Sequence, residues 1–498
     1  MSVQVNITIV GSGYVGLVAA ACFAELGHKV VCVDKDESKI ATLRAGKVPI
    51  HEELLPELLK KHLGSKLQFS TDLKDACRHA EAIFVAVGTP QDTSGRADLS
   101  YIDAVANEIS KSVDGYKLII EKSTVPVFTS EWIARILLRN GVPRSRFDVA
   151  SNPEFLREGT AVRDFLVPDR IVIGSDSDRA VELSQRIYAP LTSGEYYRRS
   201  DAIARPSPTD PTARLVVTST KSAELIKHSS NAFLAMKISF INNVANMCEA
   251  AGADVDEVAM GMGLDTRIGG KFLNAGIGYG GSCFPKDVAA FRHAAEQLGI
   301  DFGLLEQVQA INDQQQKRFV SKIASALWTL RGKRLGVLGL AFKGGTDDIR
   351  DSPAISIIEL LLAEGAEIQA YDPAATDRAR ATLSASPSLR YAASAREAAQ
   401  DADALLILTN WDEFAQLDLA ELRTALHYPI VIDGRNVFSL HAMAAAGFDY
   451  LSVGRPPVYG AAASTEAVQQ LPAVSGESSP RRAVPKTKSP VRVEIAHA

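Results

Sequence analysis

Residues 7–16 read ITIVGSGYVG, an apolar strand that runs directly into a turn with three glycines. The spacing of Gly11, Gly13 and Gly16 is the GxGxxG pattern of a dinucleotide-binding turn. Glycine lets the backbone approach a ligand closely, and the free N–H groups at a helix start favour an anionic diphosphate. Asp34 closes the next apolar strand, at the distance where an acid binds the adenosine ribose. We interpret this segment as an NAD site, because Asp34 would repel the extra 2′-phosphate of NADP.

Two later strand ends carry hydroxyl groups to the same edge of this expected sheet. The segments VGTP (87–90) and KSTVP (122–126) both follow apolar strands. Ligands of open α/β sheets bind at the carboxyl ends of the strands. We therefore expect the following residues of the first domain to bind the cofactor: Val10, Gly11, Gly13, Tyr14, Val15, Gly16, Asp34, Lys39, Thr89 and Thr124.

Short apolar strands alternate with helical segments in two parts of the chain. The pattern predicts strands at 7–10, 30–34, 82–87, 118–121, 148–150 and 171–173, and then a strand and turn at 334–342 with further strands at 367–371, 404–408 and 430–433. Such alternation is typical of a parallel, doubly wound sheet. The fold class expected is α/β, with two Rossmann-like sheets. The second turn lacks the third glycine and suits a mononucleotide better.

Residues 222–251 separate the two parts and contain neither proline nor glycine. We predict one long helix here, apolar around much of its circumference and therefore buried between domains or subunits. Residues 200–212 are polar and proline-rich and should form an exposed loop. From Arg455 onward the chain has few large apolar side chains and is expected to be a disordered tail.

The composition narrows the functional classes. The chain has 498 residues, 46% of them hydrophobic, and a net charge of -5, which gives no reason to expect a nucleic-acid partner. We see neither a signal peptide nor an apolar run long enough to cross a membrane, so we expect a cytoplasmic protein. The five cysteines have no CxxC spacing, which argues against a disulfide framework and against a metal site.

One of these cysteines stands apart. Cys283 lies in GIGYGGSCFPKD (276–287), where four glycines would allow a substrate to reach the thiol. Lys286, if folded back toward the sulfur, would favour the nucleophilic thiolate. This loop predicts a dehydrogenase that captures its product covalently.

Two further pairs have the spacing of a chemical site. Lys227 and Asn231 share one face of the long helix and could stabilise an oxygen that becomes negative, although an ordinary helix surface would also explain them. Glu154 and Glu158 in SNPEFLREG (151–159) follow a strand and could activate water, or could be ordinary helix-start acids.

The motifs GSGYVG, KSTVPV, SNPEFLREGTAVRDF, AELIKHSSNAFLAMKISFIN, FLNAGIGYGGSCFPKD, FKGGTDDIRDSPA and IDGRNVF occur in this order. In this order they resemble the UDP-glucose/GDP-mannose dehydrogenase family from about residue 5 to residue 453. The resemblance implies oxidation of UDP-glucose to UDP-glucuronate, for polysaccharide synthesis, with NAD. It makes Cys283 the nucleophile that forms a thiohemiacetal and then a thioester.

The resemblance also implies roles for the other site residues. Lys227 and Asn231 would stabilise the oxyanion, Asp287 and Thr124 would handle water or protons, and Glu158 with Glu154 would assist thioester hydrolysis. Glu158, Lys286 and Arg350 would also contact NAD. The implied substrate residues are Glu154, Phe155, Leu156, Arg157, Glu158, Lys227, Asn231, Arg267, Phe272, Leu273, Asn274, Ala275, Gly276, Gly280, Lys343 and Arg435. Arg267 would reach the neighbouring subunit's substrate, so a homodimer or larger homo-oligomer is expected.

On this basis the chain divides into an NAD-binding domain (1–212), a central helical and dimerisation domain with the cysteine loop (213–328), a UDP-sugar-binding domain (329–454) and a tail (455–498). Three alternatives stay open. They are a sister enzyme acting on GDP-mannose or a UDP-N-acetylhexosamine, a silent nucleotide-binding regulatory protein, and a two-electron 3-hydroxyacid dehydrogenase. The last two have no use for a presented thiol.

Overall fold

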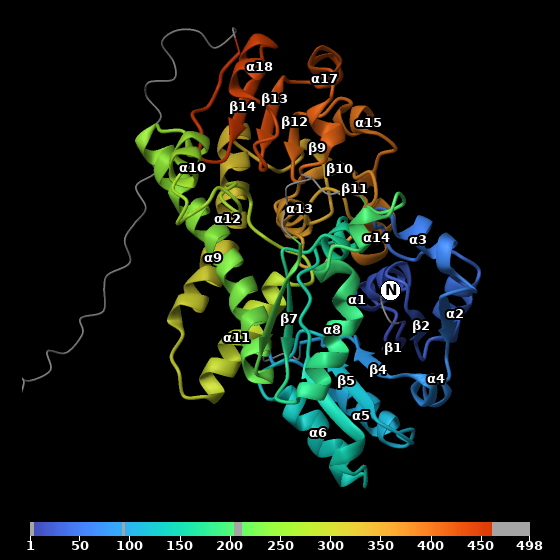
Figure 1. The fold of residues 1–498 in the computed structure, drawn as a ribbon. Helices are drawn as coiled ribbons and strands as arrows, with labels where there is room; N and C mark the ends of the chain where they lie inside the picture. The colour runs from blue at the N-terminus through green and yellow to red at the C-terminus, as the bar shows by residue number, and fades with distance from the viewer. Residues whose placement is uncertain (1–3, 92–94, 204–211, 461–498) are drawn as a thin grey trace, which may run out of the picture.

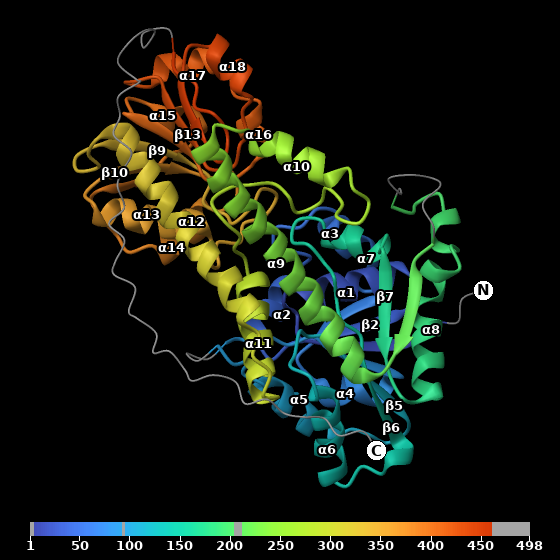
Figure 2. The same cartoon turned by 90° about the vertical axis from the view of Figure 1, so that its left-hand side faces the viewer.

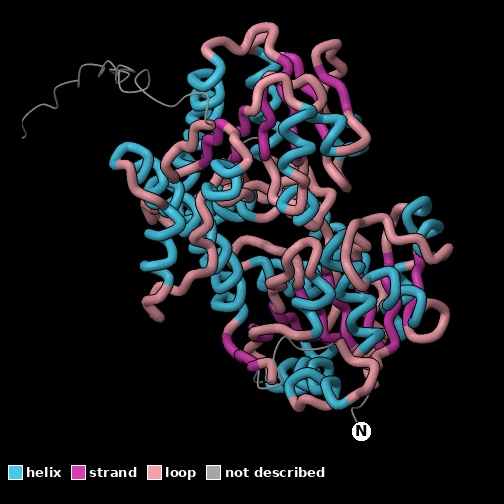
Figure 3. The backbone as a smooth tube through the Cα atoms, turned by 90° about the horizontal axis from the view of Figure 1, so that it is seen from above, coloured by secondary structure: helices cyan, strands magenta, loops and turns pink. Residues whose placement is uncertain are grey.

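A computed structural model describes residues 4–91, 95–203 and 212–460 (Figure 1). It contains two separate β-sheets, which form two groups of strands when the molecule is seen from above (Figure 3). The first sheet has the strand order β3-β2-β1-β4-β5-β6-β7-β8, and the second has the order β11-β10-β9-β12-β13-β14. The expected α/β class with two doubly wound sheets is confirmed.

The strands have the following bounds: β1 (Asn6–Val10), β2 (Lys29–Val33), β3 (Leu67–Ser70), β4 (Ala82–Val85), β5 (Lys117–Glu121), β6 (Phe147–Ser151), β7 (Arg170–Gly174), β8 (Arg214–Thr218), β9 (Arg334–Leu338), β10 (Glu367–Tyr371), β11 (Leu389–Tyr391), β12 (Ala404–Ile407), β13 (Ile430–Asp433) and β14 (Asp449–Ser452).

The α-helices have these bounds: α1 (Tyr14–Glu25), α2 (Glu37–Arg44), α3 (Leu55–His62), α4 (Leu73–His79), α5 (Ser100–Ser110), α6 (Thr129–Arg139), α7 (Ala161–Leu166), α8 (Asp178–Thr192), α9 (Thr220–Ala251), α10 (Val255–Gly263), α11 (Phe284–Gln297), α12 (Gly303–Leu327), α13 (Pro353–Ala363), α14 (Thr376–Thr382), α15 (Ala395–Ala399), α16 (Asp412–Ala415), α17 (Leu419–Ala425) and α18 (Leu440–Ala445).

Both sheets are built on the same plan. In each, the first strand lies between the second and the fourth, and the later strands continue beyond the fourth in chain order, four of them in the first sheet and two in the second. This is the strand order of a dinucleotide-binding sheet, and its ligand site lies outside the carboxyl ends of the strands, where the order reverses. In the first sheet that point lies between β1 and β4 and is opened by the glycine turn after Val10.

The first sheet is not parallel throughout, contrary to our prediction. β6 and β7 meet in antiparallel fashion through one residue pair, Ser151 with Gly174, and β8 then runs parallel to β7. The alternation of strands and helices predicts which elements neighbour one another but does not fix direction. Here only the six-residue α7 lies between the two strands, so a full parallel crossover is not formed.

An aromatic cluster anchors the first sheet to its helices. Phe23 of α1 packs against Phe84 of β4, Phe165 of α7 and Tyr188 of α8, with ring centroids 4.8, 5.1 and 5.6 Å apart. Phe23 and Phe84 are fully buried. This packing holds α1, which begins at the glycine turn, against β4, α7 and α8.

The long central helix is present as α9, two residues longer at its start than predicted. Ser219 caps it by accepting a hydrogen bond from the Ser222 N–H, and Gly252, at positive φ, ends it. α9 spans the distance between the two sheets, and α11 and α12 pack along it (Figure 2). Residues of α9 can therefore contribute to contacts with both sheets.

The expected tail begins later than predicted. Arg455 is buried, and its guanidinium donates to the Tyr450 hydroxyl and to the Phe438 carbonyl. Val458 pairs with Tyr450 through two backbone hydrogen bonds of 2.7 and 2.9 Å. Residues 455–460 therefore belong to the second sheet's fold, although their composition is that of a tail. Residues 461–498, and residues 204–211 of the predicted loop, lie outside the described residues.

Within the described residues, no helix is both long enough and apolar enough to cross a membrane.

Two truncations separate the short segment 456–460 from the residues beyond it. A chain ending at Gly460 keeps the Tyr450–Val458 pair and the bond from Gly460 N to Asp449, whereas a chain ending at Arg455 loses them. We expect the shorter chain to be less stable by about 1–3 kcal/mol. Calorimetry of both variants measures this difference, and equal melting temperatures would contradict the assignment of 456–460 to the fold.

Candidate functional site

The glycine turn after β1 has the geometry of a diphosphate cradle. Gly11 has a φ of +103°, and a Cβ there would lie 2.6 Å from the Ala86 carbonyl oxygen. A Cβ on Gly16 would lie 1.9 Å from the Gly11 oxygen, so both positions require glycine for packing. A Cβ on Gly13 would meet nothing within 4 Å. Gly13 is therefore open toward the start of α1, where an anion is favoured.

Asp34 is held beside this turn. Its Oδ2 accepts hydrogen bonds from Ser12 N and Ser12 Oγ at 2.9 and 2.7 Å, and Lys39 Nζ lies 3.3 Å away. Burial opposes ionisation, but these hydrogen bonds and Lys39 outweigh it and lower the pKa of Asp34. The site thus holds a fixed carboxylate, which suits a ribose diol and not a 2′-phosphate.

Tyr14 connects the turn to the loop that carries Glu158. Its hydroxyl is hydrogen-bonded to Glu52 and accepts from Gly159 N at 2.7 Å. Glu52 also accepts from Gly159 N at 2.8 Å, and burial raises its pKa. Val10 is buried at the end of β1, and Val15 lies within α1. At the far side of the turn, Thr89 Oγ1 donates to the Thr124 carbonyl at 2.9 Å.

Cys283 stands at the start of α11, half-buried, while the other four cysteines are fully buried. Burial and the nearby Glu154 raise the pKa of the thiol to about 11, against the opposing effect of Lys227. The thiol is therefore protonated near neutral pH. The expectation that Lys286 favours the thiolate is wrong, because Lys286 Nζ pairs with Asp287 Oδ1 at 2.8 Å instead.

Two buried polar pairs flank the sulfur. Lys227 Nζ donates to Glu154 Oε1 at 2.8 Å, and Asn231 Nδ2 donates to Asp287 Oδ2 at 2.6 Å. Burial alone would lower the pKa of Lys227, but Glu154, Asp287 and Cys283 raise it, so the ammonium stays charged. The i, i+4 pair predicted on the long helix is thus aimed at the cysteine loop and does not lie on an open helix surface.

Glu158 is connected to the same sulfur through Ser282. Ser282 Oγ donates to Glu158 Oε1 at 3.0 Å, and Arg350 Nη2 lies 3.3 Å from the same oxygen. Arg350 is also paired with Asp348 at 2.7 Å. Burial and the nearby Asp348 raise the pKa of Glu158 to about 7. Such a carboxyl group can both accept and donate a proton near neutral pH.

The predicted sugar-nucleotide loop is fixed by α9 and α12. Asn242 Oδ1 accepts from Gly276 N at 2.9 Å, and Gln315 Nε2 donates to the Gly276 carbonyl at 3.0 Å. A Cβ on Gly280 would lie 2.1 Å from the Asp351 carbonyl oxygen. Leu273 and Ala275 are buried within this loop, whereas Asn274 is exposed and Phe272 is half-buried near the ring of Phe284.

The loop after β6 is fixed as well. Arg170 lies over the Phe155 ring at 3.7 Å, and Leu156 N donates to Glu154 Oε2 at 2.6 Å. Arg157 is exposed and pairs with Asp164, its Nε lying 3.0 Å from Asp164 Oδ2.

Lys343 and Arg435 come from the second sheet. Lys343 is half-buried, and burial lowers its pKa against the opposing effect of Glu158. Arg435 donates to three backbone carbonyls, those of Leu408, Gly278 and Phe342, at 2.9–3.1 Å. In this structure Arg435 therefore holds the cysteine loop to the second sheet.

Arg267 does not join the site. Its side chain is 87% exposed and pairs with Asp265. No hydrogen bond or ion pair given for it among the described residues joins it to the sulfur network, so the implied contact with a neighbouring subunit stays a prediction.

Four residues of the site were missed by sequence reasoning. Ser282 and Asp348 contact Glu158. Glu52 contacts Tyr14. Lys122 is fully buried beside Asn152. Burial lowers the pKa of Lys122 to about 8. Ser282, Asp348 and Lys122 lie within motifs that we quoted, so their polar character next to chemical residues was a usable signal. Glu52 had none.

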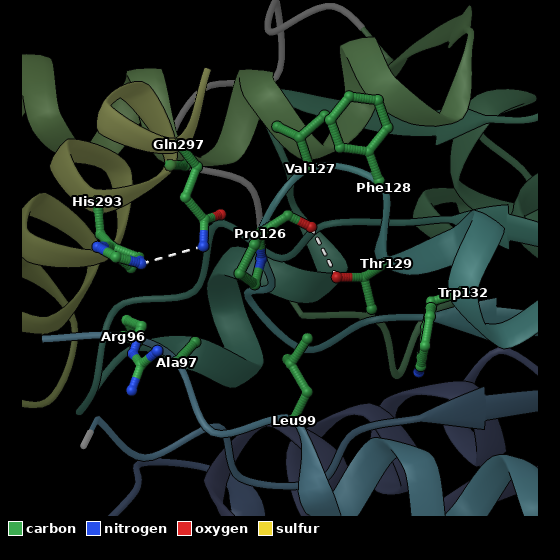
Figure 4. Close-up of a pocket in the computed structure, with 12 residues that line it drawn as sticks. Arg96, Ala97, Leu99, Pro126, Val127, Phe128, Thr129, Trp132, His293 and Gln297 are labelled. Carbon is green, nitrogen blue, oxygen red and sulfur yellow. Dashed lines mark hydrogen bonds between the residues drawn. The ribbon is translucent and has the colours of Figure 1, made fainter. Parts of the chain in front are cut away.

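A cavity lined by none of the residues of this network is shown in Figure 4. It measures about 250 Å³ and lies between the 126–129 loop, the approach to α5 and α11. In it, His293 is hydrogen-bonded to Gln297 and Thr129 donates to the Pro126 carbonyl. None of the predicted site residues lines it. A smaller cavity of about 40 Å³ is lined by Lys122, Glu154, Phe155 and Leu156 among others.

No group of three or more His, Cys, Asp or Glu side chains that could hold a metal ion occurs among residues 4–91, 95–203 and 212–460.

Comparisons with known proteins place three matched segments in one family. The NAD binding, central and UDP binding domains of the UDP-glucose/GDP-mannose dehydrogenase family match residues 5–192, 221–314 and 336–440. The chain is similar to UDP-glucose 6-dehydrogenase TuaD of Bacillus subtilis, with 45% identity over 94% of this chain and 97% of that protein. A UDP-glucose 6-dehydrogenase of Rhizobium meliloti is 46% identical over 91% of this chain and its own full length.

Solved structures give the same family. A UDP-glucose dehydrogenase from Pyrobaculum islandicum superposes with a TM-score of 0.81 and 37% identity, covering 91% of this chain and 98% of that one. A UDP-D-ManNAc dehydrogenase from Pyrococcus horikoshii gives 0.76 and 27%, covering 90% and 99%.

The open space at Gly13 gives a test of the cofactor site. Gly13 has a φ of -70°, which alanine adopts readily, so Gly13→Ala should fold normally. Its methyl group would occupy the approach of the diphosphate, and we expect NAD affinity to fall at least about tenfold. Titration calorimetry measures this, with Gly115→Ala, also in open space, as the matched control. Unchanged NAD binding in Gly13→Ala would contradict the site.

Proposed function

The chain belongs to the UDP-glucose/GDP-mannose dehydrogenase family, and we propose that it oxidises UDP-glucose to UDP-glucuronate with NAD. The observation that carries this proposal is the set of groups around the half-buried thiol of Cys283. An ammonium, an amide and two carboxylates converge there, from Lys227, Asn231, Asp287 and Glu154. A simple two-electron dehydrogenase has no use for this nucleophile.

The residues of the glycine turn fit the cofactor that the family requires. Gly11, Gly13 and Gly16 would hold the diphosphate and Asp34 the ribose, while Thr89 and Thr124 lie at the strand ends beyond them. Bound NAD would supply a hydride acceptor, used twice for a four-electron oxidation. Lys286 and Arg350 are proposed to contact it from outside the first sheet.

Lys227 and Asn231 would stabilise negative charge on the C6 oxygen. Lys227 keeps its proton in a buried position, and an ammonium and an amide fixed by buried partners need no reorganisation when charge develops. The sulfur of Cys283 would bond to C6 of the aldehyde, so that the intermediate stays attached between the two oxidation steps. This explains why the thiol lies within reach of both pairs.

Hydrolysis of the thioester requires water and a base. Glu154 lies next to Lys227 and within electrostatic reach of the sulfur. Asp287 is buried and lies beside Asn231. We propose that Glu154 and Glu158 assist the attack of water, and that Asp287 with Thr124 positions it.

We propose that the sugar nucleotide binds between the cysteine loop and the second sheet, with Lys343 toward its phosphates. The division into an NAD-binding part (1–212), a central part (213–328) and a UDP-sugar-binding part (329–454) is retained as part of this proposal. We also propose a cytoplasmic location and a homo-oligomer in which Arg267 serves the neighbouring subunit's site.

UDP-N-acetylhexosamine and GDP-mannose dehydrogenases remain the rivals, because the same fold serves a UDP-D-ManNAc dehydrogenase. The greater identity to UDP-glucose dehydrogenases supports UDP-glucose here.

The decisive test is the amount of NADH formed per UDP-glucose consumed, with UDP-glucose limiting and NAD in excess. We expect two NADH per sugar, because a primary alcohol gives up four electrons on becoming an acid. One NADH per sugar would contradict the proposal and leave an alcohol dehydrogenase. With no NADH, GDP-mannose and UDP-N-acetylhexosamines tested in parallel identify a sister activity.

A further inference from the structure

The hydroxyl of Ser282 lies between the reactive sulfur and a carboxylate. Ser282 Oγ is 3.0 Å from Glu158 Oε1 and 3.6 Å from Cys283 Sγ. The second distance is within the range of a hydrogen bond that involves sulfur. These two contacts form a continuous path from Cys283 to Glu158.

The path has a direction. Ser282 has one hydroxyl proton, and it is donated to Glu158. The hydroxyl can then only accept from the thiol, so Cys283 S–H is the donor of the second bond. Both protons point from the sulfur toward the carboxylate, which is the arrangement required for proton removal from the thiol.

The thiol needs such a path because other bases near it are engaged. Asp287 accepts from Asn231 and Lys286, and Glu154 accepts from Lys227 and Leu156 N. The Lys286 ammonium is paired with Asp287 Oδ1 at 2.8 Å. Glu158 Oε1, by contrast, accepts the hydroxyl proton of the residue that contacts the sulfur, and it also lies 3.3 Å from Arg350 Nη2.

We propose that Ser282 is a catalytic residue that passes the thiol proton of Cys283 to Glu158 as the sulfur attacks the aldehyde. The proposal rests on the proposed function and deepens it. In the step, the S–C6 bond forms and the C6–O π bond breaks, leaving a negative oxygen beside Lys227. The Cys283 proton moves to Ser282 Oγ while the Ser282 proton moves to Glu158, so one negative charge is transferred from Glu158 to the C6 oxygen.

The reverse transfer serves the last step. As water attacks the thioester, Glu154 takes one of its protons, the water oxygen bonds to C6, and the S–C6 bond breaks so that the sulfur leaves as a thiolate. Glu158, protonated since the first transfer, assists by returning its proton through Ser282 to that sulfur. The product acid and Glu154 then lose their protons to solvent, which restores the starting state. No external oxidant or reductant is needed for either transfer.

The charged groups around the path set its pH dependence. Glu158 faces Asp348, Arg350, Lys343 and the hydroxyl of Tyr14, and Cys283 faces Glu154, Lys227, Asp287 and Arg350. The pKa of Glu158 is raised to about 7, so this carboxyl is ionised and able to accept a proton above that pH. Below that pH, Glu158 is protonated and can no longer accept the proton that Ser282 passes on. Direct ionisation of the thiol would require a pH near its raised pKa of about 11.

The experiment is the rate of Cys283 alkylation by iodoacetamide between pH 5.5 and about 10, which needs no nucleotide sugar. Peptide mapping by mass spectrometry separates the label on Cys283 from label on any other cysteine. We expect little label elsewhere, because the other four cysteines are buried. Wild type is compared with Ser282→Ala, Glu158→Gln and Ser282→Thr, the last of which keeps the hydroxyl. Circular dichroism confirms that each variant is folded.

We expect wild type to gain reactivity in a step near pH 7, and Ser282→Ala and Glu158→Gln to lose this step. In both variants reactivity near pH 8 should fall at least about tenfold and rise only toward high pH. Ser282→Thr should restore the step. If Ser282 had only a structural role, Ser282→Ala would change the alkylation rate by the same factor at every pH and would keep the step near pH 7.

The proposal is overturned if wild type shows no step near pH 7, or if either Ser282→Ala or Glu158→Gln retains it. This result does not depend on the NADH stoichiometry, so failure of the relay and failure of the proposed function are distinguishable.

Discussion

The buried ion pair between Lys227 and Glu154 is the interaction on which the arrangement of the site depends. Both side chains are 5% exposed, and their charged atoms lie 2.8 Å apart. Removing one partner of such a pair leaves an uncompensated buried charge, which is strongly unfavourable. The pair therefore fixes the long helix α9 against the loop that follows β6. The other contacts around Cys283 can form only when α9 and the loop after β6 lie together at this point.

The other contacts of the site follow along α9 from Lys227. One turn further along α9, Asn231 holds Asp287 at the start of α11, and Cys283 begins the same helix. Further on, Asn242 and Gln315 of α12 fix the backbone of Gly276. The cysteine loop is thus hydrogen-bonded to the helices that lie between the two sheets, and Arg435 of the second sheet donates to its Gly278 carbonyl. A cofactor on the first sheet and a nucleotide sugar on the second would meet at the sulfur.

The fold shows which sequence signals carry information and which do not. Each interior strand of the two sheets was predicted from its apolar run, whereas the four strands that were missed, β3, β8, β11 and β14, are the four sheet edges. Edge strands are partly exposed, as in β8, and lack the continuous apolar run. In the site, the motifs predicted the residue types that converge. The pairing of Lys286 with Asp287, the contacts of Glu158 with Ser282 and Asp348, and the Tyr14–Glu52 bond depend on tertiary geometry that spacing does not encode.

The central claim is that the sugar is bonded to Cys283 between two oxidation steps. The most direct measurement is rapid acid quenching of the enzyme during turnover with NAD and UDP-glucose radiolabelled in the glucose, followed by peptide mapping. The account predicts label, acid-stable and released by hydroxylamine as expected of a thioester, on the peptide that contains Cys283. Turnover to UDP-glucuronate with no label on Cys283, or with label on another residue, would contradict it.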